Sequence, residues 1–365
     1  MTIHRLLGIY KEDTGTVDED IEDISEADLK QQEPFLPYDA IILDELSMVG
    51  GGIFYKLIRC LRPGTRLIML GDPGQLESIG LCNLIKDIQD SGVIPNVCLT
   101  KIHRQAALSG IVTEATKVYN QEHIVPVNFA GELVAGEKRD FKLVTAETVE
   151  EVAAKAIEWY DNFMRYLNAK PDEICVVVAK RAAGMASARA INEEVQKKLV
   201  FHDRVPLIFQ YSDSGVNYNV TYHEGDRVLV TKNNYNTYNC VTAEKCPIFN
   251  GNVGTIKEID AYNEGAKIEF PQGTVYVDKE NFAYIQLGYA ITCHKMQGSG
   301  INYVIYVCDP SAYTLLSKEH LYTGITRAKK LCVVLGRAST IRFATSTTRV
   351  KKKQTWLAEL LKERN

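Results

Sequence analysis

Hydrophobic and polar positions along the chain fall into blocks that have the lengths of strands and helices. Continuous apolar runs bounded by turn signals predict strands buried on both faces, namely DAIILDE, TRLIMLGD, NVCLT, EICVVVAK, YVIYVCD and LCVVLG. Helical patterns lie between them at residues 79–91, 108–121, 148–168, 185–200 and 352–363. Such alternation is typical of an α/β protein built on doubly wound parallel sheets.

Residues 205–285 break this alternation, because they are rich in Tyr, Asn, Gly, Val and Thr and have no helical period. Short strands joined by Gly and Asn turns are predicted at GDRVLVTKNNY, NGNVGTIKEID, AKIEF and GTVYVDK. Apolar strand runs resume afterwards, so we interpret this segment as a small β-barrel inserted into the second of two α/β domains. The acidic stretch 11–34 is predicted to be a surface loop, and residues 344–353 a connector to a last amphipathic helix.

Composition and charge narrow the choice of function only slightly. The chain has 365 residues, 45% of them hydrophobic, which is enough for two or three domains. The formal net charge is -4, but residues 12–45 hold thirteen acids and one Lys, whereas residues 326–365 hold eleven Lys or Arg and two acids. The basic end can contact a polyanion or be a solvated tail, and both interpretations stay open.

The nine cysteines form no C-x-x-C pair, and four of them lie in apolar, strand-like runs: Cys98, Cys175, Cys308 and Cys332. Free thiols in such runs behave as small hydrophobic side chains, which argues against a disulfide framework or a zinc site. The sequence shows no signal-peptide pattern and no apolar run of membrane-spanning length. We therefore expect a soluble, cytoplasmic protein without a membrane partner.

Two adjacent carboxylates, Asp44 and Glu45, end the first apolar run. Phosphoanhydride hydrolysis uses one carboxylate to hold Mg²⁺ and a second to polarise the attacking water. Successive side chains at a strand tip point in different directions, so an adjacent pair can divide these roles. The pair alone is a weak signal, because a helix N-terminus also favours acids.

Three further residues could act on a phosphate. Gln75, in RLIMLGDPGQLESIG, is predicted at the tip of a strand, where its amide could sense a γ-phosphate, although an ordinary strand–turn–helix connection fits as well. Arg104, in IHRQ, and Arg327, in YTGITRAKK, could neutralise charge on phosphoryl oxygens. An arginine taken alone is more often a surface or ion-pair residue.

Taken in order, TIHRLL, LDELSM, GDPGQLESIG, IHRQ, YAITCHKMQGSG and YTGITRAKK resemble the motifs of superfamily 1 DNA helicases of the RecD/TraA type. The resemblance covers nearly the whole chain. It implies tandem RecA-like domains with an SH3-like β-barrel insertion. The implied first domain is residues 1–125, the second is 126–204 and 286–365, and the insertion is 205–285. It also implies an ATP-dependent helicase, with ATP and Mg²⁺ as cofactors, that moves 5′ to 3′ along single-stranded DNA.

The resemblance assigns roles to individual residues. Asp44 would bind Mg²⁺, Glu45 would activate water, Gln75 would contact the γ-phosphate, and Arg104 with Arg327 would reach it from the facing domain. The remaining matches are the nucleotide-side residues Gln297 and Gly298, the DNA-contacting residues Thr2, His4, Thr292 and His294, and the residues Asn192 and Gln196 of a motif between the two halves.

The β-rich insertion is implied to help grip the emerging single strand. Phosphate-tracking bases and aromatic stacking platforms are typical of such grooves. The insertion offers Lys232 together with Tyr211, Tyr218, Tyr222, Tyr235 and Tyr238. Each tyrosine could instead pack the barrel.

The phosphate-binding motif G-x-x-x-x-G-K-[ST] is absent from these 365 residues. The family places that loop upstream of the stretch that matches TIHRLL, where this chain begins. We therefore expect an N-terminally truncated first domain with unpaired apolar strand edges, and no robust ATPase activity from this chain alone. Leu46, Glu77 and Gly300 also depart from the family's usual residues.

Three functional hypotheses stay open. The chain is part of a helicase, a non-catalytic module that binds single-stranded nucleic acid, or half of a split helicase whose phosphate loop comes from another chain. Retention of Asp44, Glu45, Gln75, Arg104 and Arg327 favours the first and third. DNA repair and recombination, conjugation and a mobile-element role all fit, so recombination or conjugation proteins are candidate partners.

Overall fold

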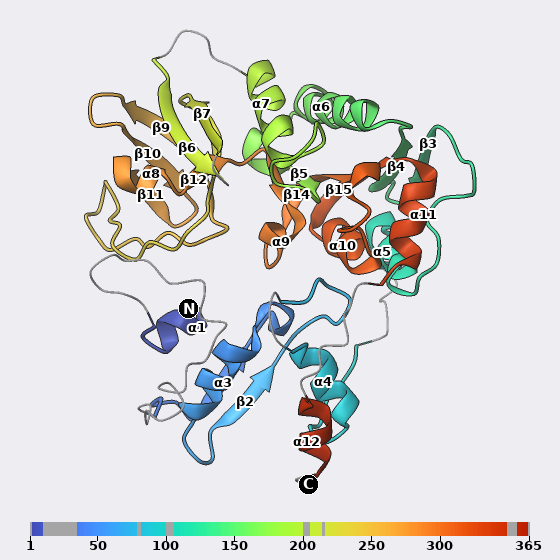
Figure 1. The fold of residues 1–365 in the computed structure, drawn as a ribbon, viewed down its shortest axis with the longest axis vertical. Helices are drawn as coiled ribbons and strands as arrows, with labels where there is room; N and C mark the ends of the chain where they lie inside the picture. Colours follow the sequence, from blue (N-terminus) through green and yellow to red (C-terminus); the bar gives the residue numbers. More distant parts are fainter. Residues whose placement is uncertain are drawn as a thin grey trace.

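The computed structural model describes residues 2–9, 35–78, 82–99, 106–199, 205–213, 216–348 and 356–363. We divide them into a first region (residues 2–99), a second region (106–199 and 288–348), an insertion (205–287) and a C-terminal segment (356–363). Figure 1 shows the first region in blue and cyan, the insertion in yellow-green to light orange, and the second region mainly in green and red.

The first region is built on a small parallel sheet of two described strands, β1 (Ala40–Leu43) and β2 (Arg66–Met69). Its helices are α1 (Ile3–Leu6), α3 (Gly51–Arg59) and α4 (Leu84–Ser91), with a 3-10 turn at Leu46–Met48. Ile41 and Leu43 point into a core with Leu57. The opposite face of the sheet is apolar and open to solvent, since Ile42 is 67% exposed and Ile68 42%.

The second region contains a six-stranded sheet in the order β13-β5-β14-β15-β4-β3, parallel except for β3. Its strands are β3 (Glu132–Ala135), β4 (Phe141–Thr145), β5 (Ile174–Val178), β13 (Ala290–Thr292), β14 (Ile301–Cys308) and β15 (Ala328–Gly336). Its helices are α5 (Gly110–Tyr119), α6 (Val149–Tyr166), α7 (Ala188–Leu199), α9 (Cys293–Met296), α10 (Lys318–Ile325) and α11 (Ala338–Ser346).

Helices cover both faces of this second sheet, which explains its continuous apolar strands. Along β5, Val176 and Val178 pack in a core with α6 and α7, whereas Cys175 and Val177 pack in a second core with α5, α10 and α11. The predicted α/β class with doubly wound parallel strands is therefore confirmed.

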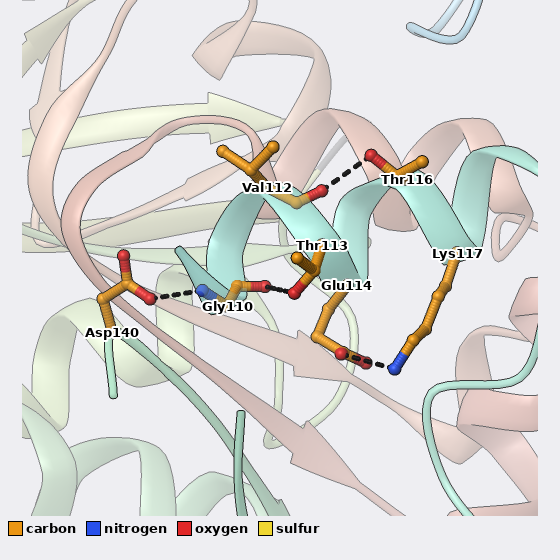
Figure 2. Close-up of polar contacts among 7 residues, drawn as sticks. All are labelled: Gly110, Val112, Thr113, Glu114, Thr116, Lys117 and Asp140. Atoms are coloured by element: carbon orange, nitrogen blue, oxygen red, sulfur yellow. Dashed lines mark hydrogen bonds and ion pairs between the residues drawn. The ribbon is translucent and has the colours of Figure 1, made fainter. Parts of the chain in front are cut away.

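Helix α5 belongs to the core of the second region, although the predicted domain boundary lies after it, at residue 125. Ile111, Ala115 and Val118 pack with Phe141 of β4. The start of the helix is fixed by Asp140, whose Oδ1 accepts the Gly110 N–H at 2.6 Å, as Figure 2 shows. Figure 2 also shows the buried Glu114 accepting a bond from Lys117 Nζ at 2.7 Å. Judged by these packing contacts, α5 belongs to the second region, so the second region begins before residue 110.

The insertion is rich in antiparallel β-structure, as the sequence predicts. Five strands pair in the order β11-β10-β9-β8-β12, and β6 pairs with β7 as a separate hairpin. The elements are β6 (Leu207–Asp213), β7 (Val216–Tyr222), β8 (Arg227–Val230), β9 (Val253–Asp260), β10 (Gly265–Phe270), β11 (Gly273–Val277), α8 (Lys279–Phe282) and β12 (Ile285–Leu287). The SH3-like character of this segment stays a prediction.

Several elements differ from the expectations. DAIILDE and TRLIMLGD were predicted to be strands buried on both faces, but β1 and β2 have one face open to solvent. NVCLT was predicted to be a buried strand, but residues 96–99 form no strand, with Val97 87% and Leu99 96% exposed. An apolar run without a neighbouring strand to pair with gains neither ladder hydrogen bonds nor burial. Helix α12 (Leu357–Glu363), predicted as part of the second domain, instead lies beside α4 of the first region (Figure 1).

Candidate functional site

The two carboxylates of the predicted Mg²⁺ site lie at the carboxyl end of β1. Asp44 is exposed, and its Oδ1 accepts the Glu45 N–H at 2.8 Å. Glu45 has a left-handed backbone, with φ 53° and ψ 48°, and directly precedes the 3-10 turn. Non-glycine residues in this conformation carry strain and are common at functional sites. The turn ends the strand abruptly and leaves the Asp44 carboxylate open to a hydrated cation.

Gln75 lies in a tight loop after the neighbouring strand, β2. Asp72 organises this loop, because its Oδ1 accepts the Gly74 N–H at 2.8 Å and its carbonyl accepts the Gln75 N–H at 3.2 Å. The side-chain oxygen of Gln75 is buried and has no hydrogen-bond partner in the part of the chain that the structure describes. A buried acceptor without a donor is costly, and its presence indicates a site for a missing donor.

Three hydrogen bonds fasten this loop to the second region. The Tyr322 hydroxyl donates to Asp72 Oδ2 at 2.8 Å, the Leu76 N–H donates to Thr323 Oγ1 at 2.9 Å, and Gln297 Nε2 donates to the Leu76 carbonyl at 2.7 Å. We call residues 72–76 and these partners the junction.

Arg327 lies on the other side of the junction and is 8% exposed. Its Nε donates to the Thr323 carbonyl at 3.2 Å and its Nη1 to the Ser299 carbonyl at 3.3 Å. These partners are neutral, and no carboxylate of the described residues forms an ion pair with Arg327. Burying a cation without a counter-charge is unfavourable, so this arrangement favours a site for an anion.

A cleft of about 780 Å³ opens beside the junction, between the first region, the second region and the insertion. Five of the six residues predicted from the sequence to bind DNA or nucleotide line its wall, together with Lys295: His4, Thr292, His294, Gln297 and Gly298. The first turn of α3, at Gly51 and Gly52, also lines it. Thr2 does not line this cleft; its Oγ1 caps α1 by accepting the Arg5 N–H at 3.2 Å.

His294 is open to the solvent of the cleft, but the surrounding protein atoms desolvate its ring and lower its pKa. The imidazole is therefore neutral at physiological pH and can act there as a hydrogen-bonding group. The positive charge on this wall comes from Lys295.

Asn192 and Gln196 join helix α7 to the insertion and to the start of β13 by hydrogen bonds. Asn192 Nδ2 donates to the carbonyls of Leu287 and Ala290, and its Oδ1 accepts the Ala290 N–H at 2.7 Å. Gln196 Nε2 donates to Asp226 Oδ2 at 2.5 Å, and burial raises the pKa of Asp226. The bonds of Asn192 to Ala290 fix the start of β13, the strand that ends at Thr292.

The insertion's tyrosines divide between packing and exposure. Tyr211 and Tyr222 are buried, and both hydroxyls bond to the Ile285 carbonyl, so they pack the core as the alternative interpretation held. Tyr235 is also buried, Tyr218 is half-buried, and Tyr238 is 57% exposed.

The structure thus brings Gln75, Gln297 and Arg327 together around the junction, and puts Asp44 and Glu45 at the end of the neighbouring strand. Arg104 lies outside the described residues. Sequence reasoning missed Asp72, Tyr322 and Thr323, which join the two regions. All three lie inside the quoted stretches GDPGQLESIG and YTGITRAKK, so those stretches were the available signal.

Among the described residues, no helix combines the length and apolarity that crossing a bilayer requires. No group of three or more potential metal ligands occurs among the same residues either.

Comparison with known proteins gives consistent matches. Residues 1–125 match an AAA domain, and residues 287–335 match the UvrD-like helicase C-terminal domain. The chain is 28% identical over 317 residues to the ATP-dependent RecD2 DNA helicase of Deinococcus radiodurans, covering 86% of this chain and 38% of the relative. It is 27% identical over 328 residues to the RecBCD enzyme subunit RecD of Mycolicibacterium smegmatis, covering 85% of this chain and 52% of that protein.

The chain therefore spans about half or less of the length of these curated relatives. A solved structure of Bacteroides Pif1 bound to single-stranded DNA aligns with a TM-score of 0.48 and 17% identity, over 92% of this chain and 78% of that one. The resemblance to RecD-type superfamily 1 helicases that the motifs indicated is confirmed by the named relatives.

Proposed function

We propose that this relative of the RecD-type superfamily 1 helicases is part of an ATP-driven motor that moves 5′ to 3′ along single-stranded DNA. The observation that carries the proposal is the position of Thr323 in the junction. Its hydroxyl accepts the N–H of the residue after Gln75, and its carbonyl accepts Nε of Arg327. A change at a phosphate near Gln75 would thereby reach Arg327 through one residue.

The residues present fit the γ-phosphate and Mg²⁺ end of a nucleotide. Asp44 would hold Mg²⁺ through water, Glu45 would orient the attacking water, and the side-chain N–H₂ group of Gln75 would donate to the γ-phosphate. The side-chain oxygen of Gln75 would then be free to accept a hydrogen bond from the attacking water. Arg327 would supply positive charge to the phosphoryl oxygens. Bound Mg-ATP would contribute the phosphoanhydride bond that is cleaved.

The phosphate cradle is the part these residues do not supply. The sequence contains no G-x-x-x-x-G-K-[ST] loop, and the open apolar face around Ile42 and Ile68 favours a covering element on the same sheet. We infer that hydrolysis needs a phosphate loop from polypeptide outside these 365 residues. Adding such a strand–loop–helix segment to the chain should then produce DNA-stimulated hydrolysis that is absent with either part alone.

Single-stranded DNA is the proposed occupant of the cleft. Lys295 would pair with a phosphate, and His4 and His294 would donate or accept hydrogen bonds. The N–H groups of the first turn of α3 make no bond within the helix and favour an anion. A non-catalytic module that binds the same strand is the second candidate. It is favoured if DNA binds and the added segment leaves the chain inactive.

The direct test of the DNA site is fluorescence anisotropy of a labelled oligothymidylate at several salt concentrations. Each phosphate contact contributes about −0.7 to the slope of log K against log salt for single strands, so Lys295→Ala should reduce the slope by roughly that amount. Lys257→Ala is the control, because Lys257 lies on β9 and pairs with Glu269 at 2.7 Å. The DNA assignment is wrong if the chain does not bind, or if both variants have the same slope as the parent.

A further inference from the structure

Glu77 is the one carboxylate among the described residues that line the cleft beside the junction, the proposed DNA site. Lys295 is the one lysine in the same lining, and no arginine of the described residues belongs to it. A carboxylate beside a phosphate chain is unfavourable in itself, because like charges repel. The position of Glu77 therefore favours a ligand group other than a phosphate on this part of the wall.

Hydrogen bonds hold Glu77 in place from two sides. The carbonyl of the preceding residue, Leu76, accepts Gln297 Nε2 at 2.7 Å, which joins the backbone at Glu77 to the second-region wall of the cleft. The side chain is held by Asn83, whose Nδ2 donates to Glu77 Oε2 at 3.1 Å. Asn83 is fixed in turn, because its Oδ1 caps α4 by accepting the Lys86 N–H at 3.2 Å. The half-buried carboxylate thus has a defined position on the wall.

A carboxylate accepts hydrogen bonds and donates none. It has about four acceptor positions, so a carboxylate that Asn83 holds can also accept from a ligand. The phosphates of a single strand are acceptors as well, and the donors of single-stranded DNA are the N–H groups on the base edges, which are unpaired there. A base edge is therefore the part of the strand that Glu77 can bind.

The four bases differ in the donors that they present. Guanine has two adjacent donors on its Watson–Crick edge, N1–H and N2–H₂, and the two oxygens of a carboxylate accept such a pair side by side. Adenine and cytosine each present one amino group beside a ring nitrogen that repels a carboxylate. Thymine presents N3–H between two carbonyl oxygens, which makes it the poorest partner.

We propose that Glu77 gives the cleft a preference for guanine, by accepting N1–H and N2–H of one base while a phosphate of the same strand lies beside Lys295. This inference rests on the proposed function, because the strand must first lie in the cleft. The two charged residues of the lining then have separate tasks. The lysine binds the backbone whatever the sequence, and the carboxylate selects a base.

The test measures binding of the whole 365-residue chain to three single strands of equal length by fluorescence anisotropy. They are oligothymidylate, a strand that alternates thymine and guanine, and the same strand with hypoxanthine in place of guanine. Hypoxanthine keeps N1–H and lacks the N2 amino group, so it removes one donor of the pair. The parent should bind the guanine strand roughly 5- to 100-fold more tightly than oligothymidylate, with the hypoxanthine strand between them.

Glu77→Gln keeps the size of the side chain and removes its charge. The variant should bind the guanine strand more weakly than the parent does, and oligothymidylate roughly 2- to 5-fold more tightly, because the repulsion is gone. If Glu77 only holds Asn83 and α4, the variant changes binding of all three strands equally. Asp90→Asn is the matched control, since Asp90 is an exposed carboxylate of α4 that does not line the cleft.

The guanine preference is refuted, and the proposed function is untouched, if the parent binds all three strands within about 2-fold of one another and with a clear salt dependence. A preference that persists unchanged in Glu77→Gln also refutes the role of Glu77. If the parent binds none of the strands, both proposals fail together. If Glu77→Gln does not fold, the order of the three strands on the parent decides.

Discussion

The two parallel-stranded sheets among the described residues both have apolar strands, but their surroundings differ greatly. All five residues of β5 are buried, and helices cover both faces of its sheet. In the first region, every second apolar residue of β1 and β2 faces solvent, with Ile42 67% and Ile68 42% exposed. An apolar strand pattern therefore predicts a strand correctly, but it does not tell whether both faces are covered within the same chain.

The difference matters for function because the acidic pair and Gln75 follow the strands of the sheet that is covered on one side only. The junction, in contrast, is complete within the chain. This contrast is the basis of our proposal that the junction couples the two regions and that the phosphate end needs a further element. The predictions below test this contrast in order of decreasing effect.

The largest effect is expected from a matched pair of isoleucine variants. Ile305, on β14, is fully buried, so Ile305→Ala should lower the free energy of unfolding by about 2–5 kcal/mol through lost burial and a cavity. Ile42→Ala removes the same atoms from an exposed position and should change the free energy of unfolding by less than about 0.5 kcal/mol. Urea denaturation of each variant measures both values. Equal losses would mean that the first sheet is already covered in solution.

A smaller effect is expected at Gly74. A Cβ there would lie 2.5 Å from the Tyr119 ring and 3.0 Å from the Tyr322 ring. Overpacking of this kind costs about 1–3 kcal/mol, so Gly74→Ala should destabilise the junction by that amount in thermal or urea unfolding. Tyr119→Ala added to Gly74→Ala clears the nearer obstacle and should restore part of the loss. A double variant no better than Gly74→Ala would contradict the packing argument.

The second region should also respond to acid through His320. This residue is 1% exposed, bonds to the Tyr306 hydroxyl at 2.6 Å, and has a pKa lowered to about 3, mainly by burial and further by His294. The unfolded state takes up a proton below pH 6.5 that the folded state excludes. Stability is therefore complete above pH 6.5 and falls as the pH drops toward 3.

The expected slope is up to about 1.4 kcal/mol per pH unit between pH 6.5 and 5, and His320→Gln should flatten it. Unfolding by urea at a series of pH values measures this slope. His123→Gln, at an exposed position, should leave most of the slope in place. If the His320→Gln variant shows the same pH dependence of unfolding free energy as the parent, His320 is not the group responsible.

The smallest effect is expected from single hydrogen bonds of the junction. Tyr322→Phe keeps the ring and removes the bond to Asp72, which should cost about 1 kcal/mol locally. Hydrogen exchange of the Leu76 amide should then accelerate roughly 5-fold, since the amide opens with the loop. Tyr313→Phe, on a tyrosine that packs against Phe343, is the control. Exchange at the parental rate in Tyr322→Phe would mean that the loop is held by other contacts.

Much of the fold followed from the sequence, because long apolar runs such as EICVVVAK and YVIYVCD have one favourable environment, the inside of a parallel sheet. The strand prediction for NVCLT was wrong because a short apolar run forms a strand only where a neighbouring strand supplies hydrogen bonds. The packing of α12 against the first region could not be predicted either, because the pattern of an amphipathic helix does not specify which core the helix covers.

The sequence indicated residues that could carry chemistry, and their roles stay predictions, whereas residues that only hold other groups in place gave no signal. Gln75, Arg327, His4 and His294 were identified from their motifs. Tyr322 and Thr323 lie inside the quoted stretch YTGITRAKK but were missed, because a tyrosine or threonine there has no distinctive pattern of its own. Their partners lie about 250 residues away in sequence, as Asp72 does from Tyr322.

The most direct test of the account is steady-state Mg-ATP hydrolysis by the purified 365-residue chain, with and without single-stranded DNA, beside a Glu45→Gln variant. The account predicts DNA binding together with a turnover that DNA does not stimulate and that Glu45→Gln does not change. DNA-stimulated turnover that Glu45→Gln abolishes would contradict it, because these residues would then form a complete phosphate site.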